Sequence, residues 1–297
     1  MTSSPLELSA ANRQVGLSSI RQLPDERWDD RWERIVCPPG FKQRLLSYAL
    51  FCFAGREQLS SVGLPAHGLA LIAGPPGTGK TTLAHGLANQ VAKEVVQRGI
   101  SDRVVFVVVD PHALPSEMLG GSQRATAALF ERGIPDIADD GHPVVVLLDE
   151  VEALAVNRRT ASGSTNPVDV HRATAAVLTG IDRVAEQCRN VLFVATTNDI
   201  GRVDDAFLSR ADLTEHLGLP SSEAIREILA DALRELSLDV PVETEHLDVI
   251  AKECAEREMD ARQVRKLVLR ALINGGPELA MAPRSLRLEH VFAALTP

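Results

Sequence analysis

The sequence is poor in the residue patterns that build metal and redox sites. Its four cysteines, Cys37, Cys52, Cys188 and Cys254, are widely spaced and form no C-x-x-C pair, which argues against a zinc or thiol redox site of that type. We therefore expect reduced cysteines with structural roles. The eight histidines form no H-E-x-x-H pattern, so a hydrolytic metal site of that class has no support either.

Long apolar runs are also missing. Val104–Val109 and Val144–Leu148 are among the longest runs in the chain, and both are far shorter than the roughly 20 residues that span a bilayer. The segment Met1–Ala10 lacks the basic and then apolar pattern of a secretory signal. We therefore expect a cytoplasmic protein without a membrane partner.

Basic side chains are outnumbered by acidic ones. Lys and Arg total 31 against 40 Asp and Glu, which gives a formal net charge of -9. Constitutive binding along nucleic acid relies on an excess of positive charge that neutralises phosphates. We therefore expect no direct nucleic-acid partner, although a small local basic patch is compatible with this balance.

Short apolar runs alternate with helical stretches from Gly68 onward. The runs are bounded by turn or polar residues, as is typical of buried parallel strands, and they are Leu69–Ile72, Val104–Val109, Val144–Leu148 and Val191–Ala195. The stretches between them have the length and apolar spacing of crossover helices, and they are Thr81–Arg98, Ser122–Ala138 and Val168–Ala185. This alternation predicts an α/β fold, a three-layer sandwich around a parallel sheet.

Composition divides the chain into three predicted segments. Residues 1–27 are polar with little periodicity, so we expect a flexible lead-in and order beginning near Trp28. Residues 28–220 form the large α/β domain, and the mainly helical residues 221–297 form a small second domain. Near the start of the large domain we expect an amphipathic helix over Phe41–Leu59, with an apolar face made of Leu45, Leu46, Ala49, Leu50 and Phe53.

A glycine-rich loop follows the first apolar run. Residues 74–81 read Gly-Pro-Pro-Gly-Thr-Gly-Lys-Thr and fit G-x-x-x-x-G-K-[ST], in which glycines let backbone N–H groups close around phosphate oxygens. Lys80 would reach the β and γ phosphates and Thr81 would hold Mg²⁺ through its hydroxyl, while the following helix directs its positive end at the nucleotide. We therefore predict an ATP and Mg²⁺ site that contains Gly74, Pro75, Pro76, Gly77, Thr78, Gly79, Lys80, Thr81 and Thr82.

Polar residues end two later apolar runs. Asp149 and Glu150 follow Val144–Leu148, at the strand edge where ligands of open α/β sheets bind. We predict that Asp149 holds Mg²⁺ and that Glu150 is the catalytic acceptor that polarises the attacking water. Asn198 follows another run and could orient water beside the γ phosphate. An acidic pair alone is a weak signal, and a plain strand-ending turn also explains Asn198. The assignments rest on the presence of the phosphate loop in the same sequence.

These motifs, with a helical C-terminal domain, resemble the AAA+ ATPases. Three segments resemble the pachytene-checkpoint branch more narrowly, and they are residues 148–154 (Leu-Asp-Glu-Val-Glu-Ala-Leu), 176–182 (Ala-Val-Leu-Thr-Gly-Ile-Asp) and 205–212 (Asp-Ala-Phe-Leu-Ser-Arg-Ala-Asp). The likeness covers roughly Trp32 to the C-terminus, and the Arg-Ala-Asp sequence is its most specific part. The resemblance implies a P-loop AAA+ fold with a helical lid domain, and a ring that is usually a homohexamer.

Two arginines gain roles from this resemblance. Arg210 matches the finger that reaches the nucleotide of a neighbouring subunit, where a guanidinium stabilises the charge of the transferring phosphoryl group. Arg262, in residues 261–267, matches the segment that reports nucleotide state. A helix-end surface arginine remains the alternative for Arg210, and other arginines close to Arg262 are alternatives for that role.

The resemblance also implies two loops that line a central pore. Ser116–Gly120 corresponds to the first loop, but Met118 and Leu119 stand there where an aromatic residue is usual, so they would supply only flexible apolar contact. Residues 157–167 correspond to the second loop, and an ordinary solvated loop explains their composition equally well.

The function that the resemblance implies is mechanical. The branch remodels HORMA-domain proteins, and because few residues precede Trp28 the chain resembles compact bacterial members linked to cyclic-oligonucleotide antiphage defence. In that setting the ATPase opens a closed HORMA protein and so switches off its nucleotidyltransferase. The main alternative is a nucleic-acid-directed AAA+ ATPase of helicase or clamp-loader type, which the acidic charge disfavours. A scaffold that binds ATP without turnover is a third reading, and the complete set of Lys80, Asp149, Glu150 and Asn198 argues against it.

Overall fold

The computed structural model describes residues 16–56, 66–110, 121–157, 167–236 and 244–295. The chain divides into two compact units. Unit 1 comprises Met1–Trp32, Gly40–Ala73 and Thr81–His216, and unit 2 comprises Glu33–Pro39, Gly74–Lys80 and Leu217–Pro297. The phosphate-loop sequence therefore belongs to unit 2 up to Lys80 and continues in unit 1 with Thr81.

Unit 1 is built on a six-stranded sheet with the strand order β1-β3-β4-β5-β2-β6. Five strands run parallel, and β1 pairs antiparallel with β3. The strands are β1 (Leu17–Leu23), β2 (Leu69–Ala73), β3 (Val104–Val109), β4 (Val144–Leu148), β5 (Val191–Thr197) and β6 (Leu213–His216). All four predicted strands are confirmed, and β2, β4 and β5 are buried along their whole length, as their continuous apolar sequences require.

The strand β1 corrects the prediction that order begins near Trp28. Leu17 pairs with Val109 and Leu23 pairs with Val104, so residues 17–23 extend the sheet by backbone hydrogen bonds. Within this strand only Leu23 is fully buried, and its apolar residues recur at every third position rather than alternating, so the sequence pattern does not indicate a strand. The predicted domain limits at 28–220 and 221–297 stay predictions.

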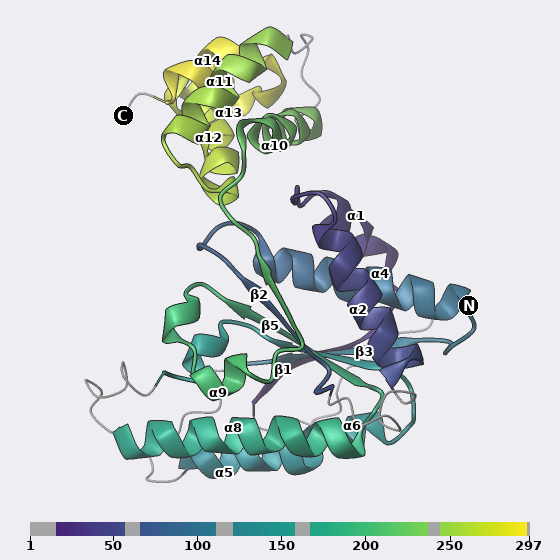
Figure 1. Ribbon diagram of the computed structural model, residues 1–297. Helices are drawn as coiled ribbons and strands as arrows, with labels where there is room; N and C mark the ends of the chain where they lie inside the picture. Colours follow the sequence, from purple (N-terminus) through teal and green to yellow (C-terminus); the bar gives the residue numbers. More distant parts are fainter. Residues whose placement is uncertain (1–15, 57–65, 111–120, 158–166, 237–243, 296–297) are drawn as a thin grey trace. The chain divides into compact units, whose positions relative to one another are not determined.

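Helices cover both faces of the sheet, so unit 1 is the predicted three-layer sandwich (Figure 1). The first layer contains α1 (Asp29–Glu33), α2 (Phe41–Ala54) and α4 (Lys80–Gln97), and the other contains α5 (Gly121–Ala128), α6 (Ile134–Ala138) and α8 (Pro167–Gln187). Between them, buried side chains of the sheet form the core with residues such as Phe130, Ile181 and Phe193. Short 3-10 turns at Val151–Ala153 and Ile200–Arg202 and the helix α9 (Asp205–Leu208) complete the unit.

Two predicted helices differ in detail. Residues 121–138 form α5, a π-helical turn at Leu129–Gly133 and α6, rather than one α-helix. Pro135 explains the break, because it has no N–H to donate to the carbonyl four residues earlier. In α2 the buried residues are Phe41, Leu45, Ala49 and Cys52, so Leu45 and Ala49 of the predicted face are confirmed, while Leu46, Leu50 and Phe53 are only half-buried beside it. Residues 57–59 of that prediction lie outside the described residues.

Unit 2 is helical around a core of its own. Its helices are α10 (Ser222–Glu235), α11 (Thr244–Glu256), α12 (Ala261–Asn274), α13 (Gly276–Met281) and α14 (Leu288–Ala293). Ser221 caps α10 and Asp260 caps α12 through side-chain hydrogen bonds to the first turn. Buried residues of the five helices form one core cluster, against which Val36 also packs. The helical character predicted for the C-terminal region is confirmed.

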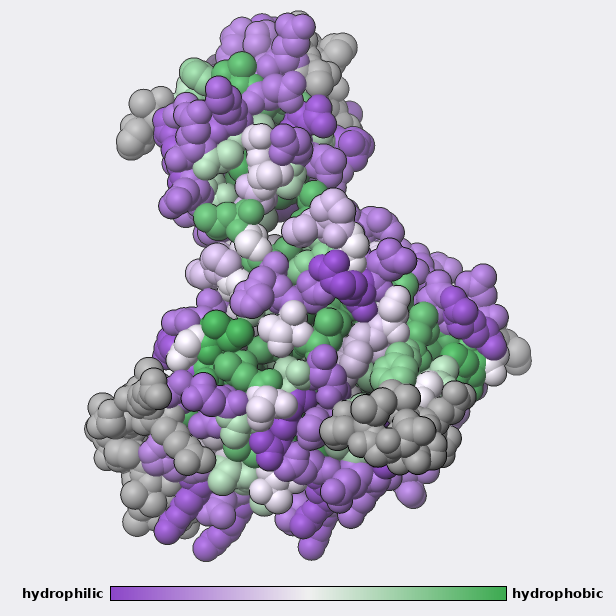
Figure 2. All heavy atoms as spheres, viewed as in Figure 1, coloured by the Kyte–Doolittle hydropathy of each residue, from purple (hydrophilic) through white to green (hydrophobic). Residues whose placement is uncertain are grey.

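Hydrophilic side chains cover much of the visible surface around α5 and α8 (Figure 2). Arg183 of α8 forms an exposed ion pair with Glu131, with 2.9 Å between Nη1 and Oε1, while Val177 and Ile181 of the same helix are buried in the core. The described helices include none that is both long enough and apolar enough to cross a membrane.

Candidate functional site

The glycine-rich loop in unit 2 is held in a compact conformation by hydrogen bonds from Lys80 to its own backbone carbonyls. The Lys80 ammonium donates to the carbonyl oxygens of Gly74 and Pro75, each at 2.8 Å, and Lys80 is only 6% exposed. Gly77 has a φ of 80°, and a Cβ there would lie 2.3 Å from Asp260 Oδ1. Only glycine fits this position, both for its backbone conformation and for its space. The loop is thus compact, and its role as a phosphate cradle stays a prediction.

The start of α12 contacts this loop within unit 2. Asp260 caps the helix by accepting from Gln263 N at 2.9 Å, and Gln263 Oε1 accepts from Asp260 N at 2.9 Å. Arg262, two residues after Asp260, donates its backbone N–H to Gly77 O at 3.2 Å. The side chain of Arg262 is exposed. Arg262 is therefore placed next to the loop through its backbone, and its role as the reporter of nucleotide state stays a prediction.

Thr81 and Asp149 meet in unit 1. The Thr81 hydroxyl donates to Asp149 Oδ1 at 2.9 Å and lies 3.2 Å from Oδ2. Thr81 stands in the first turn of α4, and Asp149 directly follows β4. A hydroxyl and a carboxylate are oxygen ligands of the kind that Mg²⁺ prefers, so these two residues fit the metal that the sequence predicts. Thr82, the next residue of the predicted set, is exposed.

The ends of β4 and β5 are tied together by side chains. The register that pairs Leu148 with Ala195 brings Thr196 beside the carboxylates. Thr196 Oγ1 donates to Asp149 Oδ1 at 2.5 Å and accepts from Glu150 N at 3.0 Å. Thr196 is 1% exposed. It was not among the predicted site residues, although its place in the polar segment after the apolar run was the available signal.

Glu150 and Asn198 contact each other at this edge. Asn198 Nδ2 donates to Glu150 Oε1 at 3.2 Å, and Asn198 N donates to Glu152 Oε1 at 3.0 Å. Glu150 adopts the left-handed conformation with φ 51° and ψ 53°, which costs a non-glycine residue about 1–3 kcal/mol. Strain of this kind persists where surrounding bonds fix the residue; here Thr196 bonds the Glu150 backbone N–H and Asn198 bonds its carboxylate. Sequence reasoning also missed Glu152, whose Oε2 is buried and has no hydrogen-bond partner among the residues that the structure describes.

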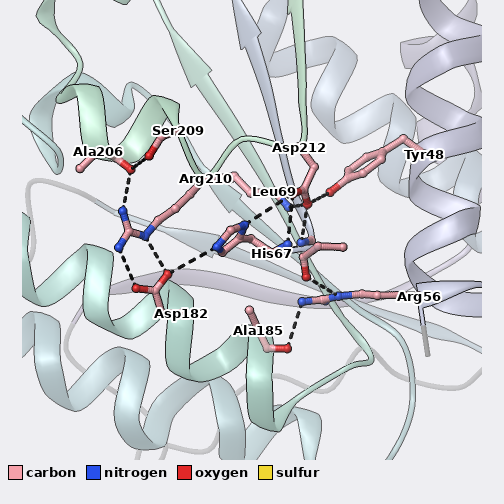
Figure 3. Close-up of polar contacts among 12 residues, drawn as sticks. Tyr48, Arg56, His67, Leu69, Asp182, Ala185, Ala206, Ser209, Arg210 and Asp212 are labelled. Carbon is pink, nitrogen blue, oxygen red and sulfur yellow. Dashed lines mark hydrogen bonds and ion pairs between the residues drawn. The ribbon is translucent and has the colours of Figure 1, made fainter. Parts of the chain in front are cut away.

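Arg210 lies away from that edge, in a polar cluster of unit 1 (Figure 3). Its Nε and Nη2 donate to the two carboxylate oxygens of Asp182, each at 2.7 Å, and Nη1 donates to Ala206 O at 2.7 Å. The bond with Asp182 raises the pKa of Arg210. The guanidinium is thus held in a bidentate pair on α8, a geometry of high specificity. The prediction that Arg210 reaches a neighbouring subunit is untested by these contacts.

His67 links Arg210's partner to a second carboxylate. Its ring nitrogens lie 3.8 Å from Asp182 and 3.5 Å from Asp212. Asp212 also accepts from Gly68 N at 2.8 Å and from the Tyr48 hydroxyl at 2.5 Å. Burial raises the pKa of Tyr48, so the phenol is a firm donor. Asp212 therefore ties α2 to the start of β2, and Figure 3 shows the chain of contacts from Tyr48 to Arg210.

A buried arginine completes this cluster. Arg56 is 2% exposed and donates to the carbonyls of Ala66, Ala185 and Val191 at 3.0, 3.1 and 3.1 Å. Burial lowers the pKa of its guanidinium, and backbone carbonyls supply the compensation that such a buried charge requires. Arg56 thus fixes the end of α8 and the start of β5, the strand that contains Thr196 near its other end and is followed by Asn198.

Most residues of the two predicted pore loops lie outside the described residues. Met118 and Leu119, with the rest of Ser116–Gly120, lie outside the described residues. Within the range predicted as the second loop, only residues 157 and 167 are described. Asn157 donates to the carbonyls of Gly201 and Val203 at 3.3 and 3.4 Å, which anchors the first residue of the predicted loop.

The fold and these clusters define a class of nucleotide-dependent protein, and sequence comparison agrees. Residues 70–219 match the family described as "ATPase family associated with various cellular activities (AAA)". The chain therefore belongs to the AAA ATPase family, whose members bind nucleotide. Within that family it belongs to the group of the pachytene checkpoint protein 2 homologues and CD-NTase-associated protein 6, which confirms the resemblance drawn from the motifs.

Particular relatives show how far the likeness extends. The chain is 42% identical to CD-NTase-associated protein 6 of Pseudomonas aeruginosa over 99% of this chain and 95% of that protein. It is 34% identical to the pachytene checkpoint protein 2 homolog of Danio rerio over 77% of this chain. It spans about half the length of that relative, 52%.

Solved structures support the same fold. A chain of the HORMA:CdnC:Trip13 complex of E. coli MS115-1 has a TM-score of 0.78 at 19% identity, with 94% of each chain covered. PCH-2 of C. elegans has a TM-score of 0.74 at 27% identity, with 95% of this chain and 77% of that chain covered. The predicted P-loop AAA+ architecture is therefore confirmed.

Proposed function

We propose that this chain is an ATP-driven remodeller that converts a closed HORMA-domain protein to its open form. The observation that carries the proposal is the 42% identity to CD-NTase-associated protein 6, which extends over 95% of that relative. Kinship with the pachytene checkpoint protein 2 homologues supports the same reaction. The setting that we propose is a bacterial antiphage system, in which opening the HORMA protein switches off an associated nucleotidyltransferase that makes cyclic oligonucleotides.

The proposed driver is hydrolysis of Mg²⁺-bound ATP. Lys80 would bind the β and γ phosphates, and Thr81 and Asp149 would hold the metal, which when bound neutralises phosphate charge. Glu150 would accept the proton of the attacking water, and Asn198, which contacts Glu150 at 3.2 Å, would hold that water in line. The carboxylate and the amide lie close enough to share one water molecule, which supports this pair of roles.

A homohexameric ring is the assembly that we propose. In it Arg210 would leave Asp182 and reach the nucleotide of the next subunit, where it would stabilise the transferring phosphoryl group. Arg262 would report nucleotide state to the lid, because its backbone already contacts Gly77 in the phosphate loop. The small helical second domain at residues 221–297 would act as that lid. Oligomeric mass measured with and without ATP tests the ring.

The deciding experiment combines the purified chain with a HORMA protein closed around a labelled peptide. We expect ATP and Mg²⁺ to release the peptide, and the HORMA protein to stimulate hydrolysis several-fold. Glu150→Gln is the matched control, because it preserves shape but removes the proton acceptor. Release of peptide by the control at the wild-type rate would show that opening does not need hydrolysis.

Two outcomes would redirect the proposal. Absence of both peptide release and stimulation would contradict HORMA remodelling. Hydrolysis that rises with DNA and falls steeply with added salt would instead indicate a nucleic-acid-directed ATPase, a class that the net charge of -9 disfavours. The two results are separable, since the same hydrolysis assay is run with each partner.

A further inference from the structure

Thr196 occupies a position from which it touches both acidic residues of the predicted catalytic pair. It lies in β5, one residue beyond the last β4–β5 pair, Leu148 and Ala195. Its side chain is 1% exposed, so water cannot replace the contacts that its hydroxyl makes. Its oxygen lies 2.5 Å from Asp149 Oδ1 and 3.0 Å from Glu150 N.

These two contacts fix where the hydroxyl proton points. A backbone N–H can only donate, so the bond from Glu150 N uses a lone pair of the Thr196 oxygen. The one hydroxyl hydrogen is then directed at Asp149 Oδ1, which accepts it. The hydroxyl therefore acts as a relay of fixed direction from the Glu150 backbone to the Asp149 carboxylate.

The relay orients the carboxylate that faces Thr81. Asp149 Oδ1 accepts from both Thr81 at 2.9 Å and Thr196 at 2.5 Å. Because a carboxylate rotates about its own bond unless it is held, a second donor from β5 fixes its plane. Hydrogen bonds that hold a metal-binding side chain typically change metal affinity or activity 10- to 100-fold, to order of magnitude, when they are removed.

The same relay holds the backbone of Glu150. That residue is in the left-handed region, with φ 51°, and its N–H is bonded to Thr196 rather than to another backbone group. Without the hydroxyl, this N–H would lose its partner and the backbone would be free to leave its strained conformation. The Glu150 carboxylate would then move with it.

The neighbouring residue Thr197 provides a contrast within the same strand. It is also buried, at 0% exposure, and its hydroxyl accepts from Asp199 N at 3.2 Å. That bond leads toward the following turn and not to Asp149 or Glu150. The two threonines therefore share a type and a strand but differ in what they hold.

We propose that Thr196 is the positioning residue of the ATP site, where its hydroxyl holds the Asp149 carboxylate for the metal and the Glu150 backbone for catalysis. This inference rests on the proposed hydrolysis of Mg²⁺-bound ATP. It assigns a task to a residue outside the predicted set of Lys80, Thr81, Asp149, Glu150 and Asn198.

The test measures metal binding separately from turnover. Mn²⁺ binding to the full chain with ADP is followed by electron paramagnetic resonance, and ADP binding without metal is followed by calorimetry. We expect Thr196→Val to weaken Mn²⁺ binding about 10- to 100-fold and to lower kcat by a similar factor, while metal-free ADP affinity stays at the wild-type value. Thr196→Ser, which keeps the hydroxyl, should restore both quantities.

Control variants make the outcome decisive. Thr197→Val removes a buried hydroxyl from the same strand and should leave Mn²⁺ affinity at the wild-type value. Thr196→Ala is measured beside Thr196→Val, because it removes the hydroxyl without placing a methyl group near Asp149, and thermal unfolding shows which of the two folds. Wild-type Mn²⁺ affinity in a folded variant that lacks the Thr196 hydroxyl would overturn the inference, as would an equal loss in Thr197→Val. Failure of the wild-type chain itself to hydrolyse ATP would instead overturn the proposed function.

Discussion

Two regions of unit 1 differ in how their predicted site residues are held. At the ends of β4 and β5, Glu150 bonds to Asn198, and Thr196 bonds to both Asp149 and Glu150. In the other region, Arg210 bonds to Asp182 of α8 and to Ala206 of α9. At the β4–β5 edge the predicted site residues contact one another, since Asp149 accepts from Thr81 and Glu150 accepts from Asn198. In the second region, the partner Asp182 came from the resemblance segment and had no assigned role. A single chain therefore already contains an assembled β4–β5 edge, while the predicted task of Arg210 requires an existing ion pair to break.

The largest effect is expected at Arg210. Arg210→Ala should lower ATP hydrolysis by about 10³-fold or more, as loss of an arginine finger does in other ATPases and GTPases. Nucleotide affinity should stay near the wild-type value, because within the described part of the chain Arg210 bonds to Asp182 and Ala206 and not to the β4–β5 edge. Steady-state hydrolysis and calorimetric binding check the two expectations. Unchanged hydrolysis would reduce Arg210 to a structural partner of Asp182.

The next effect is expected at Glu150. Glu150→Gln should lower hydrolysis by about 100-fold or more, because an amide cannot accept the proton of the attacking water. It should retain ATP and stabilise a complex with a HORMA protein. Gel filtration of the variant with ATP and the partner measures retention. A normal hydrolysis rate would remove Glu150 from its assigned role.

The Arg210–Asp182 pair should also contribute to the stability of the folded chain, separately from any role of Arg210 in hydrolysis. A double-mutant cycle with Asp182→Asn and Arg210→Gln should give a coupling of about 1 kcal/mol in the free energy of unfolding, because the pair is bidentate but partly exposed. Urea unfolding of the four proteins provides the cycle. A coupling near zero would mean that the pair does not restrain Arg210 in the isolated chain.

The smallest effect concerns His85, which lies one turn after Thr81 on α4. Burial lowers the pKa of His85 from 6.5. Its ring packs edge-on against the rings of Trp28 and Phe106, with 5.0 and 5.2 Å between ring centroids. Since the unfolded chain takes up a proton more readily, the folded state loses stability as pH falls below about 6.5 and is unaffected by this group above it. His85→Phe should reduce the pH dependence of the unfolding midpoint between about pH 7 and 5.5. An identical dependence in the variant would assign it to other groups.

The sequence predicted the parts of the fold that apolar burial determines. Strands β2, β3, β4 and β5 follow from their apolar runs, and the phosphate loop follows from the need for glycine at residues such as Gly77. The strand β1 was missed because it is held on the sheet by backbone hydrogen bonds to β3. Backbone pairing does not depend on side chains, so the sequence contains little indication of it.

Site residues divide in a similar way. Asp149, Glu150 and Asn198 were predicted because carboxylates and amides at strand ends can bind a metal or orient water, and their roles stay predictions. The contacts of Thr196 and Glu152 could not be predicted, since they depend on which strand lies beside which, and a threonine near a strand end has no chemistry of its own. The Arg210–Asp182 pair depends likewise on the packing of α8 against the turn after α9, which no short motif encodes.

The edge strand β1 has a mechanical consequence. Its antiparallel pairing places Gly16 beside Asp110, whose N–H donates to Gly16 O at 2.9 Å. A pulling force applied to the chain at Gly16 would therefore load the C-terminal end of β3 first, before the parallel strands that follow it in the sheet. A fluorophore or tether attached at Gly16 would accordingly report on motion at Asp110, the last described residue before the segment predicted to grip the client.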